Sequence, residues 1–147
     1  MQGIMSKFSN RLKELIDEKE LSLTALARET GIQQSNLSDF LAEKHTPSFA
    51  NFVALLSFFN CSAEYLLGRT ELPTTEKLYP VLPFHERLRA VMKECGISQT
   101  KMIKEMPVSS GALYKWVSGK AQPSTDTLIR LADFLDCSVD YLIGRIR

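Results

Sequence analysis

Apolar residues recur at spacings of three and four along the first part of the chain, which is typical of amphipathic helices. One such stripe and the start of the next consist of Phe8, Leu12, Leu15, Ile16, Leu26 and Ala27. No stretch alternates convincingly between apolar and polar residues with the period of two that a half-buried strand requires. The pattern therefore predicts an all-α fold.

The chain repeats itself after 76 positions. Residues 8–69 align with residues 84–145 without a gap, and 19 of the 62 aligned positions are identical. The matches include Arg11 with Arg87, Leu37 with Leu113, Cys61 with Cys137, and Gly68 with Gly144. Such self-similarity indicates a duplicated domain, and each copy is expected to fold as an independent unit.

The repeat divides the chain into a first domain at residues 1–69, a linker at 70–83 and a second domain at 84–147. Pro73, Pro80 and Pro83 interrupt any helix between the copies. Fourteen extended residues span at most about 46 Å. Such a linker allows the domains to lie side by side or apart.

Five short helices fit each copy, because residues that begin and end helices stand between the apolar stripes. In the first copy these are Ser22, Gly31, Ser48, Ser62 and Gly68, and in the second they are Ser98, Ser124, Ser138 and Gly144.

Within the first copy, a helix after Ser22 is followed by a tight turn at residues 31–33 and a second helix near Gln34. Two helices joined in this way cross each other, and in a helix-turn-helix motif the second one enters the major groove of DNA. Leu37, Phe40 and Leu41 are expected to face inward. The polar residues expected on the exposed side are Gln33, Gln34, Ser35, Asn36, Ser38 and Asp39. The alternative is that this stretch is only a solvated helix face.

The second copy carries several separated motifs in order. Residues 96–99 read Gly-Ile-Ser-Gln, residues 115–120 read Lys-Trp-Val-Ser-Gly-Lys, and residues 135–142 end the copy with Leu-Asp-Cys-Ser-Val-Asp-Tyr-Leu. In these motifs the chain resembles the lambda-repressor-like family, also called the Cro-type or XRE family, of helix-turn-helix proteins. The resemblance covers most of the chain. It implies two tandem five-helix DNA-binding domains and a sequence-specific transcriptional regulator, acting as a repressor without a cofactor.

The resemblance also assigns residues to DNA. Gln99 matches the family's phosphate-contacting glutamine, and Lys44 and Lys120 match positions that approach the DNA backbone after the recognition helix. The base-reading positions match Gln34, Ser35 and Asp39 in the first copy, and Ser110, Gly111 and Lys115 in the second. Ser109 and Tyr114 complete the expected DNA-contacting set. The amide of glutamine suits adenine, whereas Ser110 and Gly111 carry little direct base information.

Two departures from the family concern the helix pair. The first copy has Leu23 where the second has Gln99, and the second copy has Pro107 where the first has Gly31. Proline cannot adopt the positive φ that glycine allows in this turn. The second turn is therefore expected to differ, and with it the angle of its recognition helix.

Charge separates the two copies although the whole chain has a net charge of only +1. Residues 1–69 hold 7 basic and 8 acidic side chains (7 − 8 = −1), whereas residues 84–147 hold 10 and 7 (10 − 7 = +3). The hypothesis is that the second domain supplies more of the salt-dependent affinity for DNA, and the first, through Gln34, more of any base selectivity.

Other function classes lack support in the sequence. Three cysteines without a C-x-x-C pair suggest neither a disulfide framework nor a zinc site, and the isolated His45 and His85 do not suggest a metal site. No nucleophile–base pair or phosphate loop indicates an enzyme. With no transmembrane stretch and no signal peptide, the protein is expected to be cytoplasmic.

Two questions stay open at this level. One or both domains could bind another regulator or a toxin instead of DNA, and Leu23, Asp39 and Glu43 favour this reading for the first domain. The two copies could also form a pseudo-two-fold pair, a head-to-tail pair, or part of a homodimer.

Overall fold

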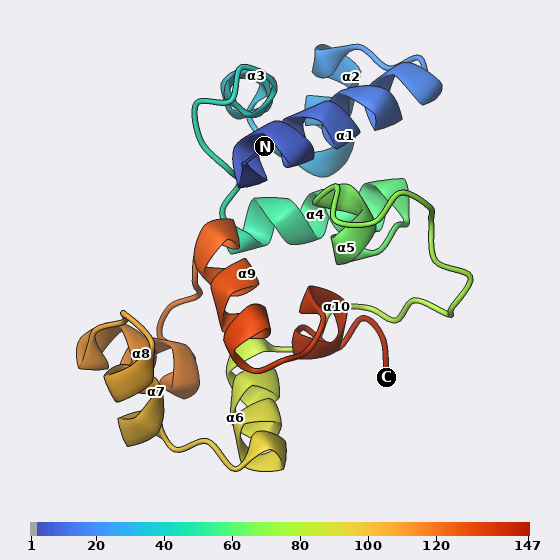
Figure 1. Cartoon of the computed structure of the whole chain (residues 1–147). Helices are drawn as coiled ribbons and strands as arrows, with labels where there is room; N and C mark the ends of the chain where they lie inside the picture. The colour runs from blue at the N-terminus through green and yellow to red at the C-terminus, as the bar shows by residue number, and fades with distance from the viewer. Residues whose placement is uncertain (1–2) are drawn as a thin grey trace. The chain divides into compact units, whose positions relative to one another are not determined.

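The computed structural model of the protein describes residues 3–147, and all their regular structure is helical (Figure 1). This confirms the predicted all-α fold. The chain forms two compact units: the first runs to Leu78 and takes in Ser124–Asp126, and the second comprises Tyr79–Pro123 and Thr127–Arg147.

The first unit holds five helices, as the sequence predicts. They are α1 (Ile4–Glu18), α2 (Leu23–Thr30), α3 (Gln34–Leu41), α4 (Phe49–Phe59) and α5 (Ala63–Leu66). Helix α1 contacts α3 and α5, and α2 contacts α3 and α4. Their apolar faces enclose a core in which Phe8, Leu26, Leu37, Phe52 and Leu66 are almost completely buried. The helical periodicity therefore identifies the faces that pack inward.

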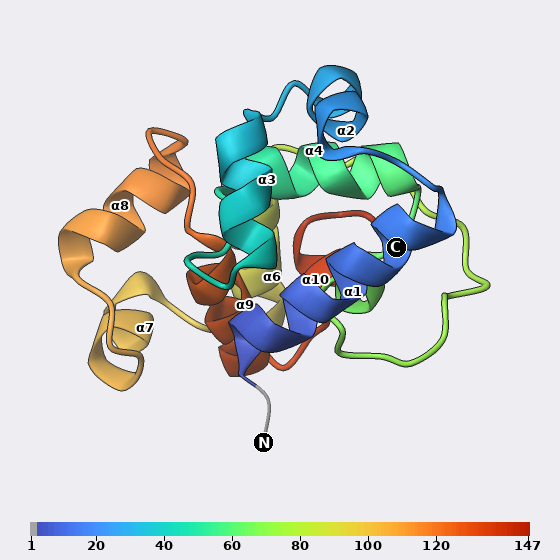
Figure 2. The same cartoon turned by 90° about the horizontal axis from the view of Figure 1, so that it is seen from above.

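The second unit is also built from five helices, one of which, α9, begins in the Ser124–Asp126 segment. They are α6 (Phe84–Cys95), α7 (Gln99–Glu105), α8 (Ser110–Ser118), α9 (Thr125–Phe134) and α10 (Val139–Leu142). Helix α6 contacts both α8 and α10, which lie on opposite sides of it in both views (Figures 1 and 2). The buried core includes Phe84, Leu88, Leu113, Leu131 and Leu142.

Serine side chains begin most of the shorter helices. Ser22 accepts a hydrogen bond from the backbone N–H of Ala25 (3.1 Å), and Ser98 accepts one from Lys101 (3.1 Å). The same cap recurs at Ser48, Ser62, Ser109 and Ser138. Each cap satisfies one backbone donor that the first turn of the helix leaves free. The predicted helix starts at Ser22, Ser48, Ser62, Ser98 and Ser138 are thus confirmed, and the cap at Ser109 adds one that was not predicted.

An arginine on the first helix of each domain contacts a tyrosine on the last. Arg11 donates from Nη1 to the backbone oxygen of Tyr65 (2.7 Å), and its Cζ lies 3.8 Å from the centre of the Tyr65 ring. Arg87 donates from Nη2 to the backbone oxygen of Tyr141 (2.6 Å), with Cζ 5.0 Å from that ring centre. The repeated pair ties the two ends of each domain together through a hydrogen bond and a cation–π contact.

Part of the segment predicted as a linker belongs to the second unit. The N–H of Tyr79 donates to the oxygen of Arg145 (2.8 Å), and that of Leu82 donates to the oxygen of Ile143 (3.0 Å). Nη1 of Arg145 in turn donates to the oxygen of Tyr79 (3.1 Å). Residues 79–83 therefore run along the C-terminal segment of the second domain.

Glu20 has a left-handed backbone conformation, and the equivalent residue of the second domain is glycine. Its φ is +52°, and the equivalent Gly96 has a φ of +67°. A side chain in this left-handed region costs about 1 kcal/mol.

Replacing Glu20 by glycine is therefore expected to raise the free energy of unfolding of the first domain by up to about 1 kcal/mol, measured by urea denaturation. Lys13→Gly in the middle of α1 is the control, because glycine there is expected to destabilise by about the same amount. A loss of stability in Glu20→Gly would contradict the assignment of strain.

Tyr141 titrates above its ordinary pKa of 10.0, chiefly because its hydroxyl donates a hydrogen bond to Oε2 of Glu94 (2.6 Å). Burial and the negative charge of Glu94 act in the same direction. The pKa of Tyr141 is higher in the folded protein than in the unfolded chain. The hydrogen bond to Glu94 therefore contributes to stability in full below the pKa of the unfolded state, and this contribution is lost as the pH rises through the pKa of the folded state. We expect Glu94→Gln to lower the pKa of Tyr141, measured by ultraviolet titration against Tyr141→Phe. An unchanged titration would show that Glu94 is not the cause.

Candidate nucleic-acid interface

The turn between α2 and α3 is set by local contacts. Gly31 ends α2 with a φ of +77°, and its N–H donates to the oxygen of Ala27 (2.9 Å). Thr30 donates its hydroxyl to the oxygen of Leu26 (2.7 Å) and accepts the N–H of Ile32 (3.3 Å). Ile32 is buried. These contacts hold α3 at a defined angle across α2, as the helix-turn-helix prediction requires.

Helix α3 presents the polar start that the sequence predicts. Gln33, Gln34, Ser35 and Ser38 are exposed, while Leu37 is completely buried on the other side. Phe40 is buried as expected, and Leu41 is only half-buried. The expectation of full exposure is wrong for Asn36 and Asp39, which are half-buried because they flank the inward stripe of Leu37 and Phe40.

The amide of Gln34 is oriented by Thr24, which is not among the DNA-contacting residues predicted from the sequence. The hydroxyl of Thr24 on α2 donates to Oε1 of Gln34 (3.2 Å). The amide oxygen of Gln34 keeps a second lone pair and the amide nitrogen keeps both donors, so both ends of the amide can still meet a base edge. The equivalent threonine at position 100 is identical in the repeat, which was the available signal for Thr24.

Asp39, near the end of α3, contacts the side chains of Lys44 and His45. Its Oδ1 lies 3.7 Å from Nζ of Lys44, and its Oδ2 lies 3.2 Å from Nε2 of His45. The ring of His45 also packs edge-on against Phe40, with centroids 5.4 Å apart. Asp39 therefore offsets part of the positive charge of Lys44. The sequence does not indicate this pairing, because the six-residue separation between Asp39 and His45 gives no helical signal.

The turn of the second domain differs from that of the first, as Pro107 predicts. Helix α7 ends at Glu105, and Met106 has an extended backbone with φ −114° and ψ 137°. A residue before proline is driven out of the helical region by the proline ring. Ser109 then caps α8 by accepting the N–H of Ala112 (3.1 Å). The chain thus reaches α8 without the left-handed residue used at Gly31.

The exposed surface of α8 is basic and aromatic. Tyr114 is 54% exposed, and Nζ of Lys120 lies 5.0 Å from the centre of its ring. Lys115, which occupies the position of Asp39, is exposed as well. Within residues 3–147 neither lysine forms an ion pair. Both charges therefore remain available to phosphate groups.

The other predicted residues of the second domain are also on the surface. Ser109, Ser110 and Gly111 lie at the exposed start of α8, and Gln99 is exposed at the first position of α7. In the first domain the corresponding Leu23 is half-buried. Gln99 thus lies at a helix N-terminus, where a phosphate is favoured by the helix dipole. Its contact with DNA stays a prediction.

Features that would indicate other chemistry are absent from the described residues. The three cysteines form no disulfide within residues 3–147, and this part of the chain holds no cluster of His, Cys, Asp or Glu side chains suited to a metal ion. None of the helices in this part of the chain has the length and apolar character of a membrane span.

Comparisons with known proteins agree with the geometry. The helix-turn-helix family matches residues 88–142, and a second family, the helix-turn-helix domain, matches residues 9–72. Repressor protein C2 of Salmonella phage P22 is 36% identical over 58 residues, which are 40% of this chain and 27% of that protein. No solved structure matches the chain significantly.

Two bacterial relatives match at similar levels. The cryptic phage CTXphi transcriptional repressor RstR of Vibrio cholerae is 35% identical over 60 residues, covering 41% of this chain and 54% of RstR. The HTH-type transcriptional regulator YobD of Bacillus subtilis is 30% identical over 66 residues, covering 45% and 59% respectively. The chain thus matches less than two thirds of the length of each relative. The two domain matches, the five-helix folds and the exposed recognition helices together place the chain in the lambda-repressor-like helix-turn-helix family, with two tandem copies of the domain.

Proposed function

We propose that this protein is a sequence-specific DNA-binding regulator of transcription that acts as a repressor. The observation that carries the proposal is the occurrence, in both domains, of a helix with a buried apolar side and an exposed polar start, held across a preceding helix by a tight turn. Such a helix enters the major groove with its N-terminal residues. Relatives named as repressors support the same direction of control.

The two domains differ in what they offer DNA. Gln34 of α3 has an amide held by Thr24, which suits bidentate recognition of adenine. Helix α8 instead offers Lys115 and Lys120 beside Tyr114, a set that suits phosphates. We therefore assign base selectivity mainly to the first domain and salt-dependent affinity mainly to the second. Joining them raises the overall affinity when both reach the same duplex.

The first experiment measures binding of the full chain to a pool of random duplexes about 30 base pairs long, roughly three helical turns. Fluorescence anisotropy reports the affinity, and selection with sequencing reports the preferred sites. We expect an enriched motif with two half-sites, whose spacing gives the arrangement of the domains, and an affinity that falls steeply with salt. Sedimentation of the free chain separately gives its oligomeric state. No binding above background at low salt would overturn the proposal.

The pairing of Asp39 leads to a specific prediction. Replacing Asp39 by asparagine removes the negative charge that holds Lys44 and His45. We expect the affinity for the selected duplex to rise about tenfold at low salt, with a salt slope steeper by about one phosphate contact. Asp17→Asn on the exposed face of α1 is the control for the same change in net charge. If both variants bind equally, the local pairing at Asp39 has no influence on DNA.

Asp39 also favours a second candidate function for the first domain. A carboxylate on the recognition helix repels phosphates, so this domain is also suited to bind a basic surface of a protein such as another regulator or a toxin. The two functions differ in the effect of Gln34→Ala on the selected motif. Loss of one half-site from the motif supports DNA reading by the first domain. An unchanged motif and affinity would favour protein binding.

A further inference from the structure

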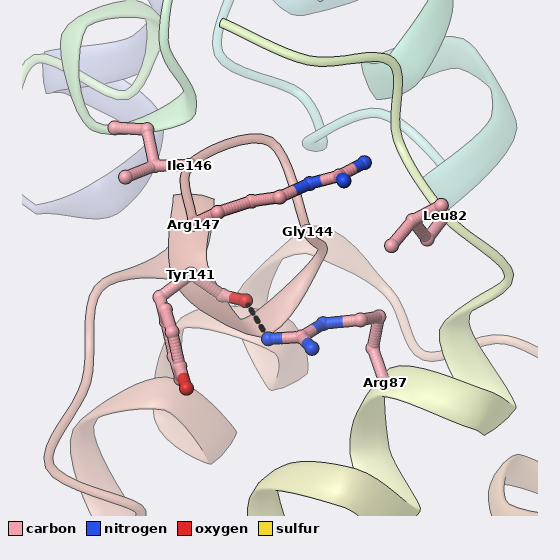
Figure 3. A pocket seen from close by; sticks show the side chains of 6 residues that line it. All are labelled: Leu82, Arg87, Tyr141, Gly144, Ile146 and Arg147. Atoms are coloured by element: carbon pink, nitrogen blue, oxygen red, sulfur yellow. Dashed lines mark hydrogen bonds between the residues drawn. The ribbon is translucent and has the colours of Figure 1, made fainter. Parts of the chain in front are cut away.

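A pocket of about 290 Å³ opens at the end of the second domain, between α6, α10 and the segment that precedes α6 (Figure 3). It is lined by Leu82, Arg87, Tyr141, Gly144, Ile146 and Arg147. Helix α10 lies on the opposite side of α6 from α8 (Figures 1 and 2). The pocket is thus separate from the proposed DNA surface, and its volume is near the lower end of the range for small-molecule sites, about 300 Å³.

Two arginines enter this pocket from different parts of the chain. Figure 3 shows the side chain of Arg147 crossing the pocket towards Leu82, and that of Arg87 reaching the backbone oxygen of Tyr141. Cζ of Arg147 lies 4.2 Å from the centre of the Tyr79 ring, and Cζ of Arg87 lies 5.0 Å from that of Tyr141. The aromatic faces hold both guanidinium groups, because the ring quadrupole attracts a cation.

In the first domain the equivalent arginine, Arg11, finds all its hydrogen-bond acceptors within the chain. Arg11 donates from Nε to Glu14 (3.1 Å), from Nη1 to the oxygen of Tyr65 (2.7 Å), and from Nη2 to the oxygen of Thr70 (3.1 Å). All three nitrogens of its guanidinium group therefore have acceptors within the chain. The arginine of the first domain serves only the fold.

The second domain lacks one of these acceptors, because Ala90 stands at the position of Glu14 and carries no carboxylate. Ile146, at the position of Thr70, keeps a backbone oxygen, but within residues 3–147 the hydrogen bond of Arg87 goes to Tyr141 instead. Arg87 keeps the bond to Tyr141, while its buried Nε has no acceptor in the described part of the chain. Unmet guanidinium donors in a partly enclosed site are costly, and a second positive charge from Arg147 adds to the cost.

We propose that this pocket binds a small organic carboxylate. Guanidinium groups pair with carboxylates through charge-assisted hydrogen bonds, and no acidic side chain lines the pocket to compete. Leu82 and Ile146 offer apolar walls for the rest of the molecule. Glu94 binds the hydroxyl of Tyr141 and is not among the lining residues. The site goes beyond the proposed function, because it involves none of the residues assigned to DNA.

The experiment is an NMR titration of the full chain with labelled arginine, which follows each Nε–H separately. The probe is benzoate, with benzamide as its neutral analogue and inorganic phosphate as an anion without an apolar part. We expect saturable shifts at Arg87 and Arg147 with benzoate, none at Arg11, and none with benzamide. The proposal is overturned if benzoate gives no saturable shift, if benzamide shifts the same signals equally, or if phosphate binds more tightly than benzoate.

Two variants separate ligand binding from folding. Ala90→Glu places at Arg87 the internal carboxylate that Glu14 supplies to Arg11, so we expect benzoate to bind at least tenfold more weakly without loss of thermal stability. Ala90→Gln is its neutral control. Arg147→Gln is also expected to weaken binding about tenfold, as the loss of one charge-assisted contact predicts. Its control is Arg89→Gln, which removes an exposed charge of α6 outside the pocket. Native affinity in both Ala90→Glu and Arg147→Gln would overturn the proposal.

Discussion

Replacing Gly68 by alanine is expected to lower the free energy of unfolding of the first domain by about 3 kcal/mol, a large effect for a single methyl group. Gly68 has a φ of +71°, and a Cβ atom built there would lie 2.8 Å from the backbone oxygen of Lys7. The positive φ alone costs about 1 kcal/mol. The clash adds more, because α1 would have to move away from the end of α5. Urea denaturation of the full chain, followed by a probe in the first domain, measures the change.

Two other glycines separate the causes. Gly31 has a similar φ of +77°, but nothing lies within 4 Å of a Cβ built there, so Gly31→Ala is expected to cost only about 1 kcal/mol. Gly144, the repeat of Gly68, would meet the flexible side chain of Leu82 at 2.8 Å instead of backbone. Its alanine variant is expected to fall between the other two. Equal losses at Gly31 and Gly68 would mean that contact with Lys7 has no part in the effect.

Reversing the charges of Lys115 and Lys120 together is expected to weaken binding to the selected duplex at least about a hundredfold at low salt. Both side chains are exposed beside the recognition helix α8, and neither is paired to a carboxylate within residues 3–147. Loss of two phosphate contacts also reduces the salt slope by about 2. Fluorescence anisotropy at several salt concentrations measures both quantities.

A matched double variant controls for net charge. Lys93→Glu with Arg130→Glu changes the charge of the second domain by the same amount at exposed positions on α6 and α9. We expect this control to lose much less affinity and to keep most of its salt slope. Equal behaviour of the two double variants would show that the second domain acts only through its overall charge, and native behaviour of both would remove it from the DNA interface.

Much of the helical plan could be predicted because its determinants are local. A serine cap contacts an N–H three residues later, as Ser22 does with Ala25, and apolar stripes reflect the helical period. Pro107 likewise acts on its neighbour Met106, so the altered turn was predictable. The polar residues at the start of α3 followed from their place after this kind of turn.

The details of the candidate site depend on contacts between residues of different helices and loops. The pairing of Asp39 with His45 requires the chain to turn back after α3, and the bond from Thr24 to Gln34 requires the packing of α2 on α3. The number of residues between the members of each pair does not fix the distance between their side chains. For this reason the sequence indicates neither the pairing of His45 nor the contact made by Thr24.

By itself, the sequence determined that this protein has two copies of one five-helix domain, because duplication and helical periodicity are properties of the order of residues. Only the tertiary structure decided what each repeated residue does. Arg11 and Arg87 are identical in the sequence, yet the first is enclosed by acceptors while the second faces a pocket with Arg147. The physical reason is that the satisfaction of a donor depends on which acceptors the fold brings within about 3 Å, wherever these lie along the chain.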